Sequence, residues 1–291
     1  MDDMALIETL KLLFNVTAHK PELAADFSDC IPDLFTILAR ISLPAPTLQP
    51  PISSILNALM NLDIPQASCT VLNIDRLEEI LERAMKEYSE QELDQGAMPL
   101  TTLLRKVYTA ASAESQQHMR KRLLPQDEAR SRPLGEDDTL PSRLLRLSIS
   151  PQLLSLRDNI STLLFELSDS DPAEFVQNIG YGYAAGFLAT HNISVPPSAM
   201  GEGSGSGIDG SQDNINPVTG QRRDAEPIHT GPEMTEEEKE REAERLFVLF
   251  ERLVFLKPSL SCSSRAWTDW TFQVASDRGC GRQEPCTAGD G

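Results

Sequence analysis

Residues 151–191 read PQLLSLRDNISTLLFELSDSDPAEFVQNIGYGYAAGFLATH, and this stretch predicts three consecutive helices. In its first part, leucines and isoleucines recur at the i, i+3, i+4, i+7 spacing of one helical face, and Ser150-Pro151 offers an N-cap and a first-turn proline. Asp171-Pro172 marks a second start, because aspartate caps free amides and proline suits the first helical turn. Gly180 then predicts a stop before a third short helix, since glycine adopts a left-handed backbone without steric cost.

Similar apolar helices are predicted before this stretch, and the spacing between their starts increases slowly along the chain. Strong helix starts near Ala5, Pro51, Pro99 and Pro151 are separated by 46, 48 and 52 residues. A period of about 40–50 residues with two or three helices per unit is typical of an armadillo or HEAT-like α-solenoid. We therefore predict an all-α fold in which residues 1–195 form the C-terminal part of such a solenoid, with an irregular helical bundle as the alternative.

Two expectations concern surface segments of this solenoid. The helix that contains Leu77 and Ile80 buries its apolar face, so its acidic residues, Glu78 among them, are expected to face water. Residues 113–142 combine mixed charge with prolines, which predicts a long surface loop. The basic triplet at 120–122 is compatible with an acidic partner, but an ordinary solvated connection explains it more simply.

The composition changes after the third helix. Residues 196–233 are rich in Gly, Ser and Asp, which predicts a flexible linker with an extended segment. Within this linker, GEGSGSG at 201–207 is a poor phosphate loop, because no strand precedes it and no lysine follows it. An amphipathic helix is predicted over 234–254, and the tail at 255–291 is expected to be unstructured because it has no helical period.

Charge and composition narrow the function classes. The formal charge of −18 argues against nucleic acid as the main partner, because nucleic acid binds basic surfaces. The alternative explanation is that the charge only keeps the protein soluble. The five cysteines form no CxxC pair, no histidine lies at metal-ligand spacing, and no nucleophile motif accompanies a histidine, so we expect neither metal nor cofactor nor covalent catalysis. No signal sequence or membrane-length apolar run is found, which predicts a cytoplasmic protein without stable membrane insertion.

Three motifs in order resemble the synembryn family, most closely its fungal members. They are GYGYAAGFL at 180–188, INPVTG at 215–220 and MTEEEKEREA at 234–243, and the resemblance covers roughly residues 5–253. The family residues that we single out within these motifs are Gly180, Tyr181, Gly182, Asn216, Pro217, Thr235 and Glu238.

The resemblance implies a function. Synembryns are cytosolic guanine-nucleotide exchange factors and folding chaperones for heterotrimeric G-protein α subunits (Gα). The resemblance therefore implies that Gα is the partner of this chain. It also implies that the chain is a monomer and that membrane-bound Gα brings it to the cell cortex. Family members extend further upstream, so we expect the present N-terminus to lack earlier repeats. The tail after Leu253 resembles nothing in the family, and we hypothesise a mispredicted splice or frame change there. A phosphorylated acidic linker known in animal members has no clear counterpart at 200–214.

Candidate partner contacts lie in the helices expected to line the inner face. An asparagine amide both donates and accepts hydrogen bonds, so it can clamp the backbone of another chain. Each candidate also has a simpler explanation as a solvent-facing or locally bonded residue. Two other function classes stay open, an armadillo-type scaffold without exchange activity and an inactive fragment. The candidate residues are Asn15, Asn57, Asn61, Arg105 and Tyr108 in the solenoid, and Phe247 and Phe250 in the amphipathic helix.

Overall fold

The computed structural model describes residues 3–153, 155–196, 215–226 and 235–255, of which Asp3, Glu236 and residues 249–255 are described by their backbone alone. These residues fall into two units that divide after Pro227, and each unit is treated by itself. Within the described ranges the secondary structure is helical apart from one isolated bridge between Ile215 and Arg222. The predicted all-α solenoid class is therefore confirmed.

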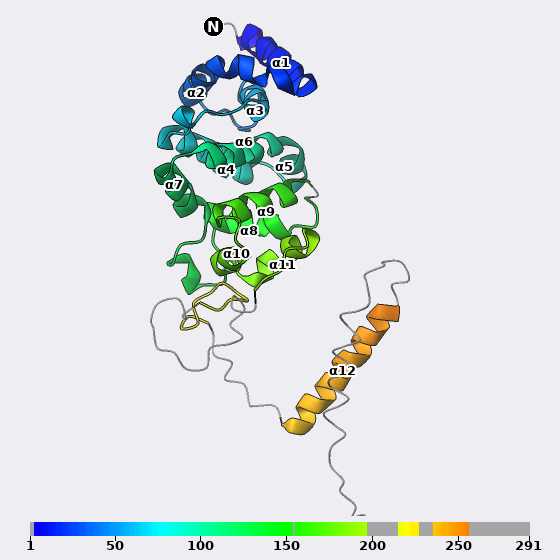
Figure 1. The fold of residues 1–291 in the computed structure, drawn as a ribbon. Helices are drawn as coiled ribbons and strands as arrows, with labels where there is room; N and C mark the ends of the chain where they lie inside the picture. The colour runs from blue at the N-terminus through cyan, green and yellow to red at the C-terminus, as the bar shows by residue number, and fades with distance from the viewer. Residues whose placement is uncertain (1–2, 154, 197–214, 227–234, 256–291) are drawn as a thin grey trace, which may run out of the picture. The chain divides into compact units, whose positions relative to one another are not determined.

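Four helices form the spine of the first unit (Figure 1). They are α1 (Asp3–His19), α3 (Ile52–Asn61), α6 (Met98–Ala110) and α9 (Ser155–Leu167), and each packs on the next. We call this series the ladder. Its helices begin at intervals close to the predicted period, because each repeat contributes one helix to the row.

The other helices flank the ladder and complete the repeats. A second row runs through α2 (Ile31–Arg40), α4 (Val71–Glu87), α7 (Ala113–Leu123) and α8 (Leu140–Ile149). The shorter elements are η1 (Pro21–Cys30), η2 (Gln66–Ser68), α5 (Glu90–Gly96), η3 (Ala129–Ser131), α10 (Pro172–Ile179) and α11 (Tyr181–Thr190). Leucine and isoleucine side chains from both rows form one continuous core, which makes each repeat dependent on its neighbours.

The prediction of a loop over 113–142 is wrong for its first third. Ser112 caps α7 by accepting a hydrogen bond from the amide of Ser115, and Met119 and Leu123 are fully buried. Only three residues of α7 are buried, Ser115, Met119 and Leu123, so the polar remainder hid its helical pattern. The rest of the segment is irregular apart from η3 and the start of α8.

The start of α9 also differs from the prediction. Pro151 lies in a turn, and the helix begins at Ser155. The side chain of Asp94 in α5 accepts hydrogen bonds from the amides of Ser155 (3.2 Å) and Leu156 (2.9 Å). A carboxylate that is distant in sequence thus supplies the N-terminal cap, which a local pattern cannot reveal.

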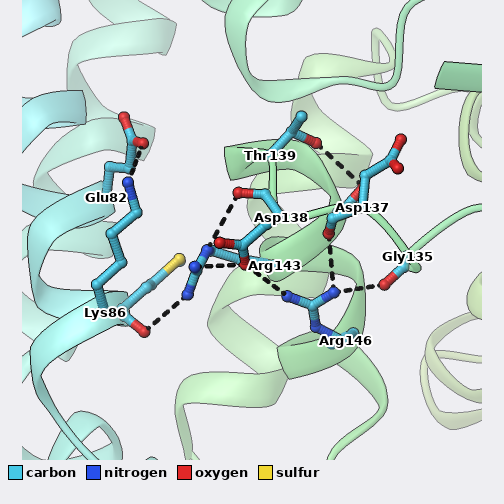
Figure 2. A network of polar contacts seen from close by, with 10 residues as sticks. Glu82, Lys86, Gly135, Asp137, Asp138, Thr139, Arg143 and Arg146 are labelled. Carbon is cyan, nitrogen blue, oxygen red and sulfur yellow. Dashed lines mark hydrogen bonds and ion pairs between the residues drawn. The ribbon is translucent and has the colours of Figure 1, made fainter.

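Two arginines of α8 hold the irregular segment before it in place (Figure 2). Arg146 donates hydrogen bonds to the carbonyls of Gly135 (2.5 Å) and Asp137 (2.9 Å). Arg143 pairs with Asp138 and also donates to the carbonyl of Met85 in α4, at 3.2 Å. The segment is therefore fixed by the second row on which it lies.

The second unit contains α12 (Glu236–Phe255). A capping box forms at its start, because the hydroxyl of Thr235 accepts a hydrogen bond from the amide of Glu238 (3.3 Å) and the Glu238 carboxylate accepts one from the amide of Thr235 (3.0 Å). None of the helices in the described part of the chain is long and apolar enough to cross a membrane.

Candidate protein-binding surface

The candidate contact residues in the solenoid all belong to the ladder. Asn15 is exposed on α1, and Asn57 and Asn61 are partly exposed on α3. No hydrogen bond is found for the side chains of Asn15 and Asn57 among the described residues. These two amides are therefore free to bind another molecule.

Asn61 is instead engaged within the solenoid. Its amide nitrogen lies 3.3 Å from the carbonyl of Phe14 and 3.3 Å from the hydroxyl of Thr17, so it connects α3 to α1. The next step of the ladder has a similar link, because Lys106 in α6 donates to the carbonyl of Leu62 at 3.1 Å. The Lys106 side chain thereby satisfies the carbonyl of the residue that follows α3.

Arg105 joins α6 to α9 through a bidentate ion pair. Its guanidinium donates to the two carboxylate oxygens of Glu166, at 2.9 and 2.6 Å, and to the side-chain oxygen of Asn159 at 3.0 Å. The Arg105 and Glu166 side chains are 32% and 24% exposed, so the pair is accessible from one side. Planar two-point pairs of this kind fix both partners in one geometry.

A shallow recess lies beside this ion pair. It has a volume of about 440 Å³ and is open to solvent. Its walls come from α6, from Glu166 and from the residues that follow α3. They combine polar side chains such as Asp63 and Lys106 with the apolar Ile64 and Ala110, and most of their exposed surface is apolar. The recess can accept a side chain of a partner that has both apolar and polar parts, but it does not resemble an enclosed cofactor site.

Tyr108 does not share this accessible surface. It is only 6% exposed, and its hydroxyl accepts a hydrogen bond of 2.8 Å from Arg120 in α7. Burial raises the pKa of Tyr108, and contact with Arg120 partly offsets this rise. The side chain therefore serves the packing of α6 against α7.

The first two family motifs meet at the end of the solenoid. Residues 215–226, which we call the clasp, lie against the start of α11. The amide of Tyr181 donates to the carbonyl of Pro217 (2.8 Å), and the amide of Gly182 donates to that of Val218 (2.9 Å). First-turn amides of a helix have no partner within the helix, so the clasp supplies the acceptors that α11 lacks.

The clasp is also held by hydrogen bonds among its own residues and by hydrogen bonds from a buried arginine. The Asn216 amide donates to the Glu226 carboxylate at 2.9 Å, and the Thr219 hydroxyl donates to it at 2.5 Å. These bonds favour the charged form and lower the pKa of Glu226. Arg130 in η3 donates to the carbonyls of Gly220 (2.8 Å) and Asn178 (2.9 Å).

Phe247 lies in the other unit, where its side chain is 60% exposed on α12, next to the exposed Leu246 and Val248. The side chain of Phe250 lies outside the described residues. Leu246, Phe247 and Val248 form an exposed apolar patch on a helix whose preceding residues are mostly charged.

Several structurally important residues were missed by sequence reasoning. Asn159 is buried and Glu166 is partly exposed on α9, and only their spacing of seven residues hinted at a shared face. Arg130 fell in the segment predicted to be a solvated loop, and no sequence signal marked it as buried. Tyr183, whose hydroxyl donates to the carbonyl of Leu134 at 2.6 Å, was visible only as part of the glycine-tyrosine motif.

Comparison with known proteins agrees with the motifs. A family model described as "Guanine nucleotide exchange factor synembryn" matches residues 1–255. The "Synembryn-like chaperone C3E7.04c" of Schizosaccharomyces pombe is 32% identical over 148 residues, which cover 47% of this chain and 28% of that protein. "Chaperone Ric-8A" of Xenopus laevis is 29% identical over 214 residues, which cover 68% of this chain and 38% of that protein.

A third relative gives the same result. "Chaperone Ric-8" of Drosophila pseudoobscura pseudoobscura is 29% identical over 205 residues, which cover 66% of this chain and 35% of that protein. The chain thus spans well under half the length of the relatives that it matches.

Proposed function

Because the chain belongs to the synembryn family of guanine nucleotide exchange factors, we propose that it binds Gα, accelerates GDP release and acts as a folding chaperone for Gα. The observation that carries this proposal is the family match over residues 1–255. The names of the relatives, which include the word chaperone, support the second activity.

The proposed mechanism is thermodynamic linkage. The ladder holds the C-terminal helix of Gα and draws it away from the nucleotide-binding core, so that the complex forms best with empty Gα. A protein that binds the empty state more tightly than the GDP state weakens GDP binding by the same factor. The same preference stabilises a nascent Gα that has not yet bound nucleotide. This role is regulatory and requires no covalent chemistry.

The remaining parts of the proposal follow from this mechanism. The chain acts as a monomer in the cytoplasm and reaches the cell cortex through membrane-bound Gα. Phe247 and the apolar patch around it on α12 provide a second contact for Gα, and Phe250 belongs to the same proposed contact. The alternative function is an armadillo-type scaffold, which would bind a partner through the same ladder without promoting exchange.

We expect this chain to accelerate the release of fluorescent GDP from purified Gα of the same organism. The measurement is the fluorescence decay in excess GTP, with and without the chain at micromolar concentration. A folded chain, as judged by circular dichroism, that binds nucleotide-free Gα but leaves the release rate unchanged would favour the scaffold. A folded chain that does neither would contradict the proposed function.

Replacement of both Asn15 and Asn57 with alanine should weaken Gα binding about tenfold, because each lost hydrogen bond contributes roughly 0.5–1.5 kcal/mol. The thermal unfolding midpoint should stay unchanged, since neither amide bonds within the solenoid. The matched control is Gln117→Ala, which removes an exposed amide from α7 in the second row. Equal affinities of the double variant and the control would exclude these two residues from the interface.

A further inference from the structure

Three potential metal ligands converge between α4 and α7, away from the ladder. Asp75 and Glu78 are three residues apart on α4, and His118 lies on α7. Their ligand atoms all lie within 4.8 Å of one another. The closest pair is Asp75 Oδ1 and His118 Nε2, at 2.7 Å.

The position of Glu78 contradicts the expectation that its side chain faces water. Its side chain is fully buried, and Oε2 accepts a hydrogen bond of 2.9 Å from Arg122, which covers it from α7. The other oxygen, Oε1, is buried without any hydrogen-bond partner, and no other buried side-chain atom of the described residues is left in this way. Such an orphaned acceptor costs about 1–3 kcal/mol, and more when it is charged.

Burial and the neighbouring charges act on this carboxylate in opposite directions. Burial raises the pKa of Glu78, while the hydrogen bond and the positive charge of Arg122 lower it. The positive charge of Arg122 balances one of the two carboxylate charges in the cluster, so a net charge of one negative unit remains. The geometry therefore offers a buried oxygen with free lone pairs, beside an imidazole and a second carboxylate.

We propose that Asp75, Glu78 and His118 bind a Zn²⁺ ion, with water as the fourth ligand. Zinc accepts mixed nitrogen and oxygen ligands in a tetrahedron, whereas Ca²⁺ and Mg²⁺ prefer oxygen ligands alone. With bonds of about 2.1 Å, tetrahedral ligands lie about 3.4 Å apart, so small side-chain rotations suffice to close the cluster around the ion.

The site is accessible and its occupation would have a structural effect. The side chains of Asp75 and His118 are 47% and 29% exposed, which gives the ion an entry path from solvent. Bound zinc would supply the missing partner of Glu78 Oε1. It would also join α4 to α7 through Asp75 and His118, which are 43 residues apart along the chain. A ligand that binds only the folded state stabilises that state.

The test is titration of the full chain with zinc chloride, followed by calorimetry and thermal unfolding. We expect saturable binding of one ion and a rise of roughly 5 °C in the unfolding midpoint at a hundredfold excess over Kd. His118→Gln and Glu78→Gln should each weaken binding at least tenfold. If Glu78→Gln fails to fold, Asp75→Asn provides the second carboxylate variant on a partly exposed position.

The chain offers a matched control for the histidine. His191 forms a similar pair with Asp158, at 3.0 Å, but among the described residues no third potential ligand lies beside it. His191→Gln should therefore leave zinc affinity unchanged. Equal affinities of His118→Gln and His191→Gln, or the absence of saturable binding, would overturn the proposal.

The visible and near-ultraviolet spectrum of the chain with Co²⁺ in place of Zn²⁺ distinguishes metal binding at this site from metal binding by cysteines. Burial raises the pKa of Cys69 to about 11, which makes its thiol a poor ligand, but the chain has four further cysteines. Co²⁺ held by imidazole and carboxylates shows weak visible bands, while thiolate ligation adds an intense charge-transfer band in the near ultraviolet. Such a band would overturn the proposal in favour of adventitious binding by cysteines.

Discussion

Replacement of Gly180 with alanine is expected to lower the free energy of unfolding of the solenoid by at least about 2 kcal/mol. Gly180 has φ +80° and ψ 147°, a combination that is essentially restricted to glycine. A Cβ atom there would also come within 2.8 Å of the Gly220 nitrogen and the Thr219 carbonyl carbon. Both are backbone atoms, so the clasp would have to move away, and the bonds that it makes to Tyr181 and Gly182 would be lost.

Urea denaturation measures this loss, and a thermal scan should show a fall in midpoint of roughly 4–8 °C. Gly186→Ala is the matched control, because Gly186 lies within α11 and an added Cβ meets nothing within 4 Å. Alanine is favoured over glycine inside a helix by up to about 1 kcal/mol, so this variant should be neutral or more stable. Similar destabilisation of the two variants would contradict the role given to Gly180.

The sequence was sufficient for the repeat architecture but not for polar segments. Apolar periodicity located the ladder helices, because each must bury one face against its neighbours. Apolar periodicity did not reveal α7, because Met119 and Leu123 are fully buried there but most of the surrounding residues are polar or charged. It also misplaced the start of α9, because Asp94 caps that helix from another element.

The candidate surface could be predicted only in part, for a related reason. Helical position placed Asn15, Asn57 and Arg105 on the ladder, but the bonds of each side chain depend on the adjacent repeat. Glu78 shows the same limit, since an acidic residue at a helix surface becomes buried once Arg122 of another repeat covers it. Long-range partners of this kind leave no periodic trace in a single sequence.

The structure also gives a physical reason for two of the family motifs. The glycine-tyrosine motif supplies the free amides at the start of α11, and the Asn216-Pro217 segment supplies the carbonyls that accept from them. Gly180 and Gly220 both have positive φ angles where the two segments touch. These motif residues thus fit one another, and partner contacts are better sought among the free side chains of the ladder.

Arg130→Met is expected to cost about 3 kcal/mol and to release the clasp. Arg130 is 4% exposed, and the substitution keeps most of its apolar volume while removing the donors to the Gly220 and Asn178 carbonyls. Each buried acceptor left without a partner costs about 1–3 kcal/mol. Arg132→Met is the control, because that side chain is 72% exposed and its ion pair with Asp137 is a surface pair, which contributes about 0–1 kcal/mol.

Hydrogen exchange at the amides of Tyr181 and Gly182 provides the direct measurement for Arg130→Met. These amides donate to the clasp, so their exchange should become faster in Arg130→Met and stay slow in Arg132→Met. Burial lowers the pKa of Arg130 because it disfavours the charged guanidinium, and the carbonyls around it, together with the Asp127 carboxylate at 4.0 Å, compensate that charge. If both amides stayed equally protected in the two variants, the clasp would be held by its own backbone bonds, and Arg130 would only fill space.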